Sequence, residues 1–150
     1  MGVIDGKTIC QVALVVKDLE KTTEEYAKLF GVPKPEIFRV SDESVAHTQF
    51  KGEPSRTRAK LAVFDLGQVV LELTEPDEEP SSWKDFLEKN GDGIHHIAFM
   101  TDDRDAAVKY FEENDMPVRH YGEYEGGNYT VFDSKEKLGT FVQVKYEPKK

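Results

Sequence analysis

Two stretches of this sequence, offset by 85 residues, repeat one pattern. Residues 9–30 read ICQVALVVKDLEKTTEEYAKLF, and residues 94–115 read IHHIAFMTDDRDAAVKYFEEND. Each stretch has an alternating apolar segment, then an acidic turn, then apolar residues at helical spacing. In this alignment Gln11 falls opposite His96. A chain that carries the same unit twice is expected to fold as two copies of one structural module.

The later parts of the two copies also match, in the same order. VFDLGQVVLELTEP begins at Val63, and VFDSKEKLGTFVQVKYEP begins at Val131. The shared VFD opens a strand hairpin in each copy, and extra residues lengthen the second turn. Glu72 then falls opposite Gln143. Two matching blocks in the same order indicate a duplication rather than a chance likeness.

We therefore predict an α+β fold built from two tandem βαβββ modules. The modules cover about residues 8–75 and 94–146, and a linker over 76–93 joins them within a single domain, residues 1–150. Their strands are expected to form a cupped, partly closed, eight-stranded mixed sheet with the helices outside. The polar segment 41–56 is predicted to be a loop.

The linker is expected to hold one short helix. Ser82 begins the sequence Ser-Trp-Lys-Asp, which resembles a capping box with Asp in place of Glu. Asn90, followed by a glycine, is typical of a helix end. Trp83 is interpreted as an anchor of this helix rather than as a platform for a ligand.

Composition limits the class of protein. The chain has 20 Lys and Arg against 29 Asp and Glu, a net charge of −9, which disfavours binding to a nucleic-acid backbone. A single cysteine, Cys10, excludes a disulfide framework and a Cys-rich zinc site and is typical of a reducing compartment. No apolar run is long enough to cross a membrane, and the first residues do not resemble a signal peptide. We expect a cytoplasmic protein that binds neither nucleic acid nor membrane.

Four polar residues occupy equivalent strand positions of the two modules, on the face opposite the apolar one. They are Gln11, Glu72, His96 and Gln143. If the modules pack about a pseudo-twofold axis, all four converge, and they could then ligate zinc, nickel, cobalt, iron or manganese. The alternative is a satisfied histidine of the sheet with glutamines as polar filler. His95 lies on the other face by alternation and is predicted to be a buried structural residue.

These segments resemble the vicinal oxygen chelate superfamily over about residues 8–146. The resemblance rests on the opening strand and helix, the segments VVLELTEP and GIHHIAFMTDD, the GGN at 126–128 and the closing GTFVQV. This superfamily includes glyoxalase I, methylmalonyl-CoA epimerase, extradiol dioxygenases and bleomycin- and fosfomycin-resistance proteins. The chain looks closest to the epimerase-like and glyoxalase-like members. The resemblance implies the fold predicted above, a divalent metal at the four polar positions and a homodimer.

The resemblance also implies proton removal next to a carbonyl group, in which a metal stabilises the enediolate or enolate and a carboxylate moves the proton. His96 and Glu72 are residue types that the family uses at their positions, whereas Gln11 replaces the commoner His. Gln143 stands where the enzymes usually have Glu, and an amide can ligate or orient but cannot take a proton. Glu72 and Gln143 are therefore the expected catalytic residues, with Glu72 or Glu53 as the candidate base. The iron site of extradiol dioxygenases would keep only His96, which argues against ring cleavage.

Cations near the proposed ligands suggest an anionic substrate. Arg58, Lys60 and Lys145 are predicted to line the open side of the sheet, and Met100 and Phe141 are predicted to wall it. The alternative is that the cations protect sheet edges from aggregation. We predict a metal-dependent isomerase or lyase of the glyoxalase/epimerase type that acts on a small anionic carbonyl compound. The alternatives are a non-catalytic binding protein of the same fold, as in drug resistance, and a metalloenzyme of different chemistry.

Overall fold

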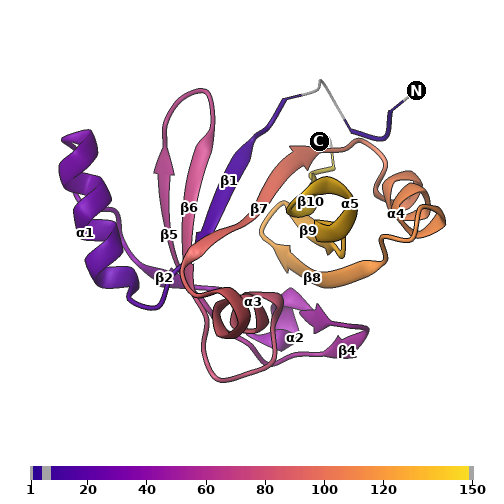
Figure 1. The fold of residues 1–150 in the computed structure, drawn as a ribbon, viewed down its shortest axis with the longest axis horizontal. Helices are drawn as coiled ribbons and strands as arrows, with labels where there is room; N and C mark the ends of the chain where they lie inside the picture. The colour runs from indigo at the N-terminus through magenta and orange to yellow at the C-terminus, as the bar shows by residue number, and fades with distance from the viewer. Residues whose placement is uncertain (1, 5–7, 149–150) are drawn as a thin grey trace.

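The computed structural model describes residues 2–4 and 8–148, and this part of the chain forms ten strands and five helices (Figure 1). The strands are β1 (Gln11–Val15), β2 (Phe38–Arg39), β3 (Gln49–Phe50), β4 (Glu53–Pro54), β5 (Lys60–Asp65), β6 (Val70–Glu75), β7 (Gly93–Met100), β8 (Val118–Tyr124), β9 (Gly127–Phe132) and β10 (Phe141–Tyr146). The helices are α1 (Leu19–Phe30), α2 (Glu43–Ala46), α3 (Ser82–Asn90), α4 (Arg104–Glu113) and α5 (Lys135–Leu138). All strands belong to one curled sheet, in the order β2-β5-β6-β1-β7-β10-β9-β8-β3-β4.

The strand pairing repeats in the two halves of the sheet. β1 is parallel to β6 with Ala13 opposite Glu72, and β7 is parallel to β10 with Ala98 opposite Gln143. Where the halves meet, β1 and β7 are antiparallel, with Gln11 opposite Ala98 and Ala13 opposite His96. The repeat offset exchanges these two pairs, as a twofold axis between β1 and β7 requires. The predicted fold class is therefore confirmed.

The sheet has ten strands rather than eight because segment 41–56 is not the loop that its polar composition predicts. It forms the short helix α2 and the strands β3 and β4. β3 pairs antiparallel with β8, with Gln49 opposite Tyr121 and Phe50 opposite His120. A segment of the first half thus continues the sheet beyond the outer strand of the second half.

Helices α1 and α4 cover the outer face of the curled sheet, as the repeat predicts (Figure 1). α1 packs against β5 and β6, and α4 packs against β8 and β10. The buried residues of α1 recur every fourth position, at Leu19, Thr23 and Ala27, which places one stripe of the helix on the sheet. Asp18 caps the start of α1 by accepting a main-chain hydrogen bond, and Gly31 ends it in the left-handed region at φ 68°.

Helix α3 lies in the linker, as predicted, but its cap is one residue earlier. The side chain of Ser81 accepts a hydrogen bond from the main-chain N–H of Lys84 at 2.9 Å, so Ser81 is the cap. The prediction of Ser82 was wrong because two consecutive serines carry the same signal. The hydroxyl of Ser82 turns instead into the interior, where the residue is fully buried. Trp83 and Phe86 anchor the helix in a buried apolar cluster.

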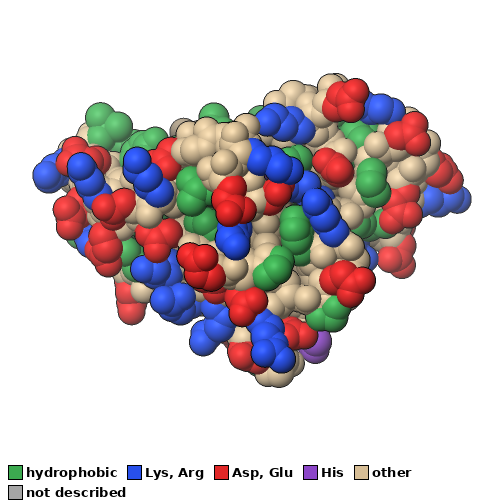
Figure 2. All heavy atoms as spheres, turned by 60° about the horizontal axis from the view of Figure 1, so that its bottom comes forward, with side chains coloured by type: hydrophobic (Ala, Val, Ile, Leu, Met, Phe, Trp, Pro, Cys, Tyr) green, Lys and Arg blue, Asp and Glu red, His purple; other side chains and the backbone are tan. Residues whose placement is uncertain are grey.

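Charged side chains of both signs are interspersed over the face shown in Figure 2. Several of the ion pairs are exposed and join residues three or four apart on a helix, such as Lys28 with Glu25 and Lys109 with Glu113. Exposed pairs of this kind contribute little to stability. Over the described residues, no helix is long and apolar enough to cross a lipid bilayer.

Candidate active site

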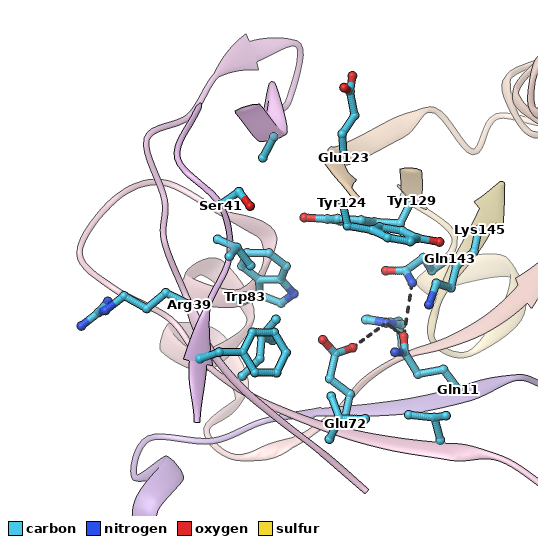
Figure 3. Close-up of a pocket in the computed structure, with 17 residues that line it drawn as sticks. Gln11, Arg39, Ser41, Glu72, Trp83, Glu123, Tyr124, Tyr129, Gln143 and Lys145 are labelled. Atoms are coloured by element: carbon cyan, nitrogen blue, oxygen red, sulfur yellow. Dashed lines mark hydrogen bonds and ion pairs between the residues drawn. The ribbon is translucent and has the colours of Figure 1, made fainter. Parts of the chain in front are cut away.

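The four polar residues of the repeat lie on the four central strands and converge beside one cavity (Figure 3). Nε2 of His96 on β7 lies 3.0 Å from Oε1 of Gln11 on β1. The amide of Gln143 on β10 donates to the same oxygen at 3.3 Å, and Oε2 of Glu72 on β6 lies 4.0 Å from Nε2 of His96. The parallel pairing of each strand couple, repeated about the twofold axis, brings the four side chains together.

Burial determines the protonation states of Glu72 and His96. The side chain of Glu72 is 14% exposed, and loss of hydration raises its pKa to about 7, against the opposing effect of the Lys145 ammonium. Burial lowers the pKa of His96 to about 3, and His120 and Lys145 add to the effect. Near pH 7 the imidazole is therefore neutral, and the carboxyl group of Glu72 exchanges its proton readily. This is the protonation range that a general base requires.

A β-bulge in β7 brings His95 into contact with His96. Ala13 of β1 lies opposite His96 while Leu14 lies opposite Ile94, so His95 is the extra residue of the strand. Strict alternation, which predicted a face away from the site, fails at this point. The Nδ1 atoms of the two rings are 2.7 Å apart, and Nε2 of His95 lies 2.8 Å from the hydroxyl of Ser82. His95 is buried, as predicted, but it contacts the site residue directly.

The cavity beside these residues has a volume of about 450 Å³. Trp83 of α3, Tyr124 of β8 and Tyr129 of β9 contribute rings to its wall (Figure 3). Glu72 and Lys145 bring charged groups to it, whereas the guanidinium of Arg39 points away. The rest of the lining is largely apolar and includes Phe38, Val40, Leu61, Val63 and Val70.

Of the residues predicted to bind substrate, Lys145 alone is among those that line this cavity. Val63 lies opposite Glu72 in the β5–β6 ladder, so Leu61 and Val63 face the cavity and Lys60 faces away. The prediction placed Lys60 on the wrong face of β5. The ammonium of Lys60 pairs with Glu75 at 3.0 Å.

Arg58 precedes β5, is exposed and donates from Nε to the carbonyl of Val40 at 3.0 Å, outside the cavity lining. Phe141 is on the expected face but packs in the buried cluster under α3, below the cavity. Met100 lies at the far end of β7, opposite Lys145, and does not line the cavity. These three residues therefore do not line the cavity as predicted, although Phe141 lies on the predicted face of the sheet.

The aromatic wall of the cavity was missed from the sequence. Trp83 reaches the cavity from the linker helix that it also anchors. Tyr124 and Tyr129 flank the β8–β9 turn, just before the repeat block that begins at Val131 and outside its aligned positions. The sole signal was the aromatic character of these residues, which is equally typical of core positions.

The donor set fits a divalent cation. Ligands held about 2.0–2.2 Å from one ion lie roughly 3–4 Å from one another, and the atoms of Gln11 and Glu72 lie 3.0 and 4.0 Å from Nε2 of His96. Two local changes are needed: the amide of Gln143 must turn its oxygen inward, and Nε2 of His96 must be free of its proton. The described residues hold no group of three His, Cys, Asp or Glu side chains suited to a metal, so a cation here depends on the amide oxygens.

Known proteins agree with this fold. The profile of the Glyoxalase/Bleomycin resistance protein/Dioxygenase superfamily matches residues 10–132. A hypothetical protein from Bacillus halodurans C-125, BH1468, is 17% identical, with a TM-score of 0.65 over 95% of this chain and 96% of that chain. A Streptomyces coelicolor methylmalonyl-CoA epimerase variant in complex with 2-nitronate-propionyl-CoA is 26% identical, with a TM-score of 0.61 over 93% of each chain.

One curated relative matches in part. The uncharacterized protein YqjC of Bacillus subtilis (strain 168) is 49% identical over 43 residues, which span 29% of this chain and 31% of that protein. The chain therefore matches less than a third of the relative's length. The profile match, by contrast, covers both halves of the repeat and all but the last of the central strands. The chain belongs to the Glyoxalase/Bleomycin resistance protein/Dioxygenase superfamily.

Proposed function

We propose that this protein is a metal-dependent isomerase or lyase that moves a proton next to the carbonyl group of a small anionic compound. The observation that carries the proposal is the position of Glu72. Its carboxyl group lies beside the cavity, 4.0 Å from Nε2 of His96, and in the protein without a cation burial raises its pKa to about 7. A group that gains and loses a proton near neutral pH is suited to this chemistry.

Each of the four residues has a role in this proposal. Gln11, His96 and Gln143 would hold the cation together with Glu72, and Glu72 would move the proton after it releases the cation. A divalent cation at this position would polarise the carbonyl group and make the neighbouring proton more acidic. Gln143 orients and ligates only, since an amide does not accept a proton at neutral pH. Glu53 precedes Pro54 in β4 and is exposed outside the cavity lining, so Glu72 is the better candidate for the base.

The cavity favours an anion with an apolar body. Lys145 supplies a cation beside the four polar residues, and its charge acts on the carboxyl group of Glu72. The rings of Trp83, Tyr124 and Tyr129 give much of the rest of the wall an apolar surface. A volume of about 450 Å³ holds a small acid, so a larger carrier group such as coenzyme A would extend outside it.

Metal content tests the proposal directly. The protein is purified without chelators, its metals are measured by mass spectrometry, and Glu72→Ala and His96→Ala are compared with Lys60→Ala, a control on the other face of β5. We expect the cation to be lost in the first two variants and retained in the third. Solvent-hydrogen exchange into methylmalonyl-CoA is then measured beside turnover of a glutathione hemithioacetal. A metal-free wild-type protein that exchanges neither compound refutes the proposal.

A second candidate is a non-catalytic binding protein with the same cavity. It is favoured by one observation: Gln11, His96 and Gln143 already satisfy one another by hydrogen bonds. In that case small aromatic acids bind without metal, and their affinity survives Glu72→Ala. Calorimetry in the presence of a chelator separates the two candidates, because the enzyme requires both the cation and Glu72.

We also infer from the family resemblance that the protein is a cytoplasmic homodimer. A homodimer doubles the mass of 17.1 kDa for one chain. Size-exclusion chromatography with light scattering measures the mass in solution. The mass of a single chain at micromolar protein concentrations contradicts the homodimer.

A further inference from the structure

A buried hydrogen-bonded series runs from the molecular surface to the site. Asp85 on α3 pairs with the guanidinium of Arg119 at 2.5 Å, and Nε of Arg119 donates to the hydroxyl of Ser82 at 2.8 Å. The same hydroxyl lies 2.8 Å from Nε2 of His95, whose Nδ1 lies 2.7 Å from Nδ1 of His96. Arg119, Ser82, His95 and His96, together called the relay below, are all at most 7% exposed.

The donor at one end gives the relay a direction. Arginine donates and never accepts, so the hydroxyl of Ser82 receives a hydrogen bond from Arg119. Within the described part of the chain, Nε2 of His95 is the one contact of this hydroxyl that can take its proton. Ser82 therefore donates to His95, and a neutral His95 carries its own proton on Nδ1.

The direction continues into the site. Nδ1–H of His95 donates to Nδ1 of His96, so the proton of a neutral His96 is on Nε2. That N–H then donates to Oε1 of Gln11 at 3.0 Å, the oxygen that also accepts from the amide of Gln143. Both rings are at most 2% exposed, and burial favours the neutral form of an imidazole. Every contact has one donor and one acceptor in this arrangement.

We propose that Arg119, Ser82 and His95 are positioning residues that hold His96 with its proton on Nε2, facing the cavity. In the metal-free protein His96 is then a hydrogen-bond donor. To ligate a cation through Nε2, both imidazoles must move their protons to the opposite nitrogen. The hydroxyl of Ser82 then loses its acceptor, so the relay opposes metal loading. This last consequence rests on the proposed function, whereas the position of the proton does not.

Nitrogen-15 NMR of the histidine rings in chelator-treated protein tests the position of the proton. In the wild type we expect His96 with its proton on Nε2 and His95 with its proton on Nδ1. Ser82→Ala removes the donor to His95, and we expect the Nε2–H form of His96 to fall to at most half of the molecules. Ser82→Thr keeps a hydroxyl group and should restore the wild-type pattern, as a general loss of packing would not.

His120 is an internal control for the same variants. Its Nδ1 accepts from the main-chain N–H of Ser82 at 3.3 Å, and a side-chain substitution leaves that N–H in place. The signals of His120 should therefore stay unchanged in Ser82→Ala. A wild-type His96 with its proton on Nδ1 overturns the proposal by itself, even if the variant does not fold. So does an unchanged His96 in a folded Ser82→Ala variant.

Zinc titration by calorimetry tests the consequence for loading. We expect Ser82→Ala to bind zinc about threefold to tenfold more tightly than the wild type. In fewer molecules of this variant must the proton of His96 move from Nε2 to Nδ1 before the metal binds. Equal or weaker binding, or no binding to either protein, refutes the link to metal loading. If the protein proves to have no isomerase activity, the proposed function fails while the NMR result still decides the relay.

Discussion

At equivalent places in the two halves, Cys10 precedes Gln11 on β1 and His95 precedes His96 on β7. The thiol of Cys10 donates to the main-chain carbonyl of Ala98 on β7 at 3.4 Å, and burial raises its pKa. The imidazole of His95 instead contacts His96 and Ser82. One duplicated backbone position thus has a thiol bonded to the main chain in the first half and an imidazole in a network of polar side chains in the second.

The bulge in β7 accounts for this difference. An extra residue turns two consecutive side chains toward one another, whereas in β1 they alternate. At the other pair of equivalent site positions, the first half carries the ionisable group. It has the carboxylate Glu72, whereas the second half has the amide Gln143. The first half therefore supplies the proton acceptor and the second half supplies the oriented imidazole. Duplication provides the geometry, and the departures from symmetry divide the chemistry between the halves.

Exchanging the carboxylate and the amide is expected to have the largest effect. Glu72→Gln removes the proton acceptor and should lower solvent-hydrogen exchange into the substrate by about 10²–10⁴-fold. Gln143→Glu adds a carboxylate at the equivalent position and should raise exchange, if the second half lacks only a base. Rates are measured by mass spectrometry in deuterated buffer. An active Glu72→Gln variant would mean that the halves do not divide the chemistry in this way.

The pH dependence of stability should also distinguish Glu72. Its folded pKa of about 7 lies above the ordinary value of 4.5, so the folded state binds the proton more tightly. The stabilisation is complete below pH 4.5 and is lost as the pH rises to about 7, a change of about 3 kcal/mol. Urea unfolding of chelator-treated protein measures it. This falling component should be absent from Glu72→Gln, and its persistence there would assign it to another group.

His95→Ala and Cys10→Ala compare the two equivalent positions directly. The first leaves the buried hydroxyl of Ser82 without its acceptor and opens a cavity, which should cost about 2–4 kcal/mol of unfolding free energy. The second removes a half-buried thiol and should cost about 1 kcal/mol or less. Equal losses in urea unfolding would show that the bulge adds no stabilising contact.

Lys145→Ala and Lys60→Ala should give the smallest difference. Lys145 lines the cavity and Lys60 pairs with Glu75 on the other face, so only the first change should weaken an anionic substrate. We expect KM to rise about tenfold in Lys145→Ala, the loss of one charge-assisted contact of about 1.4 kcal/mol. A similar rise in Lys60→Ala would mean that the anion binds elsewhere.

Much of the fold could be predicted because the repeat encodes it twice. The strands of both modules, the helix caps at Asp18 and Gly31 and the convergence of the four polar residues follow from local pattern and symmetry. β3 and β4 could not be predicted, because each has only two residues and shows no alternation. β3 pairs with a distant strand, β8, and β4 joins the sheet through β3.

The wrong predictions at the site also arose because contacts between distant parts of the sequence decide the local structure. The parity of β5 is set by its pairing with β6, and a shift of one residue carried Lys60 to the wrong face. The bulge at His95 breaks alternation without any glycine or proline to signal it. The aromatic cavity wall depends on where α3 and the β8–β9 hairpin dock, which is long-range packing.

The sheet ends in a very short strand at each edge. The order of strands begins with β2 and ends with β4, each of two residues, and β4 contains Pro54, which has no N–H to donate. β2, however, pairs with only Lys60 and Leu61 of the six-residue β5, so in the described part of the chain the rest of the outer edge of β5 has no strand partner. Addition of a strand from another chain is therefore opposed at the β4 margin, where Pro54 lacks the N–H, more than beside β2 and β5.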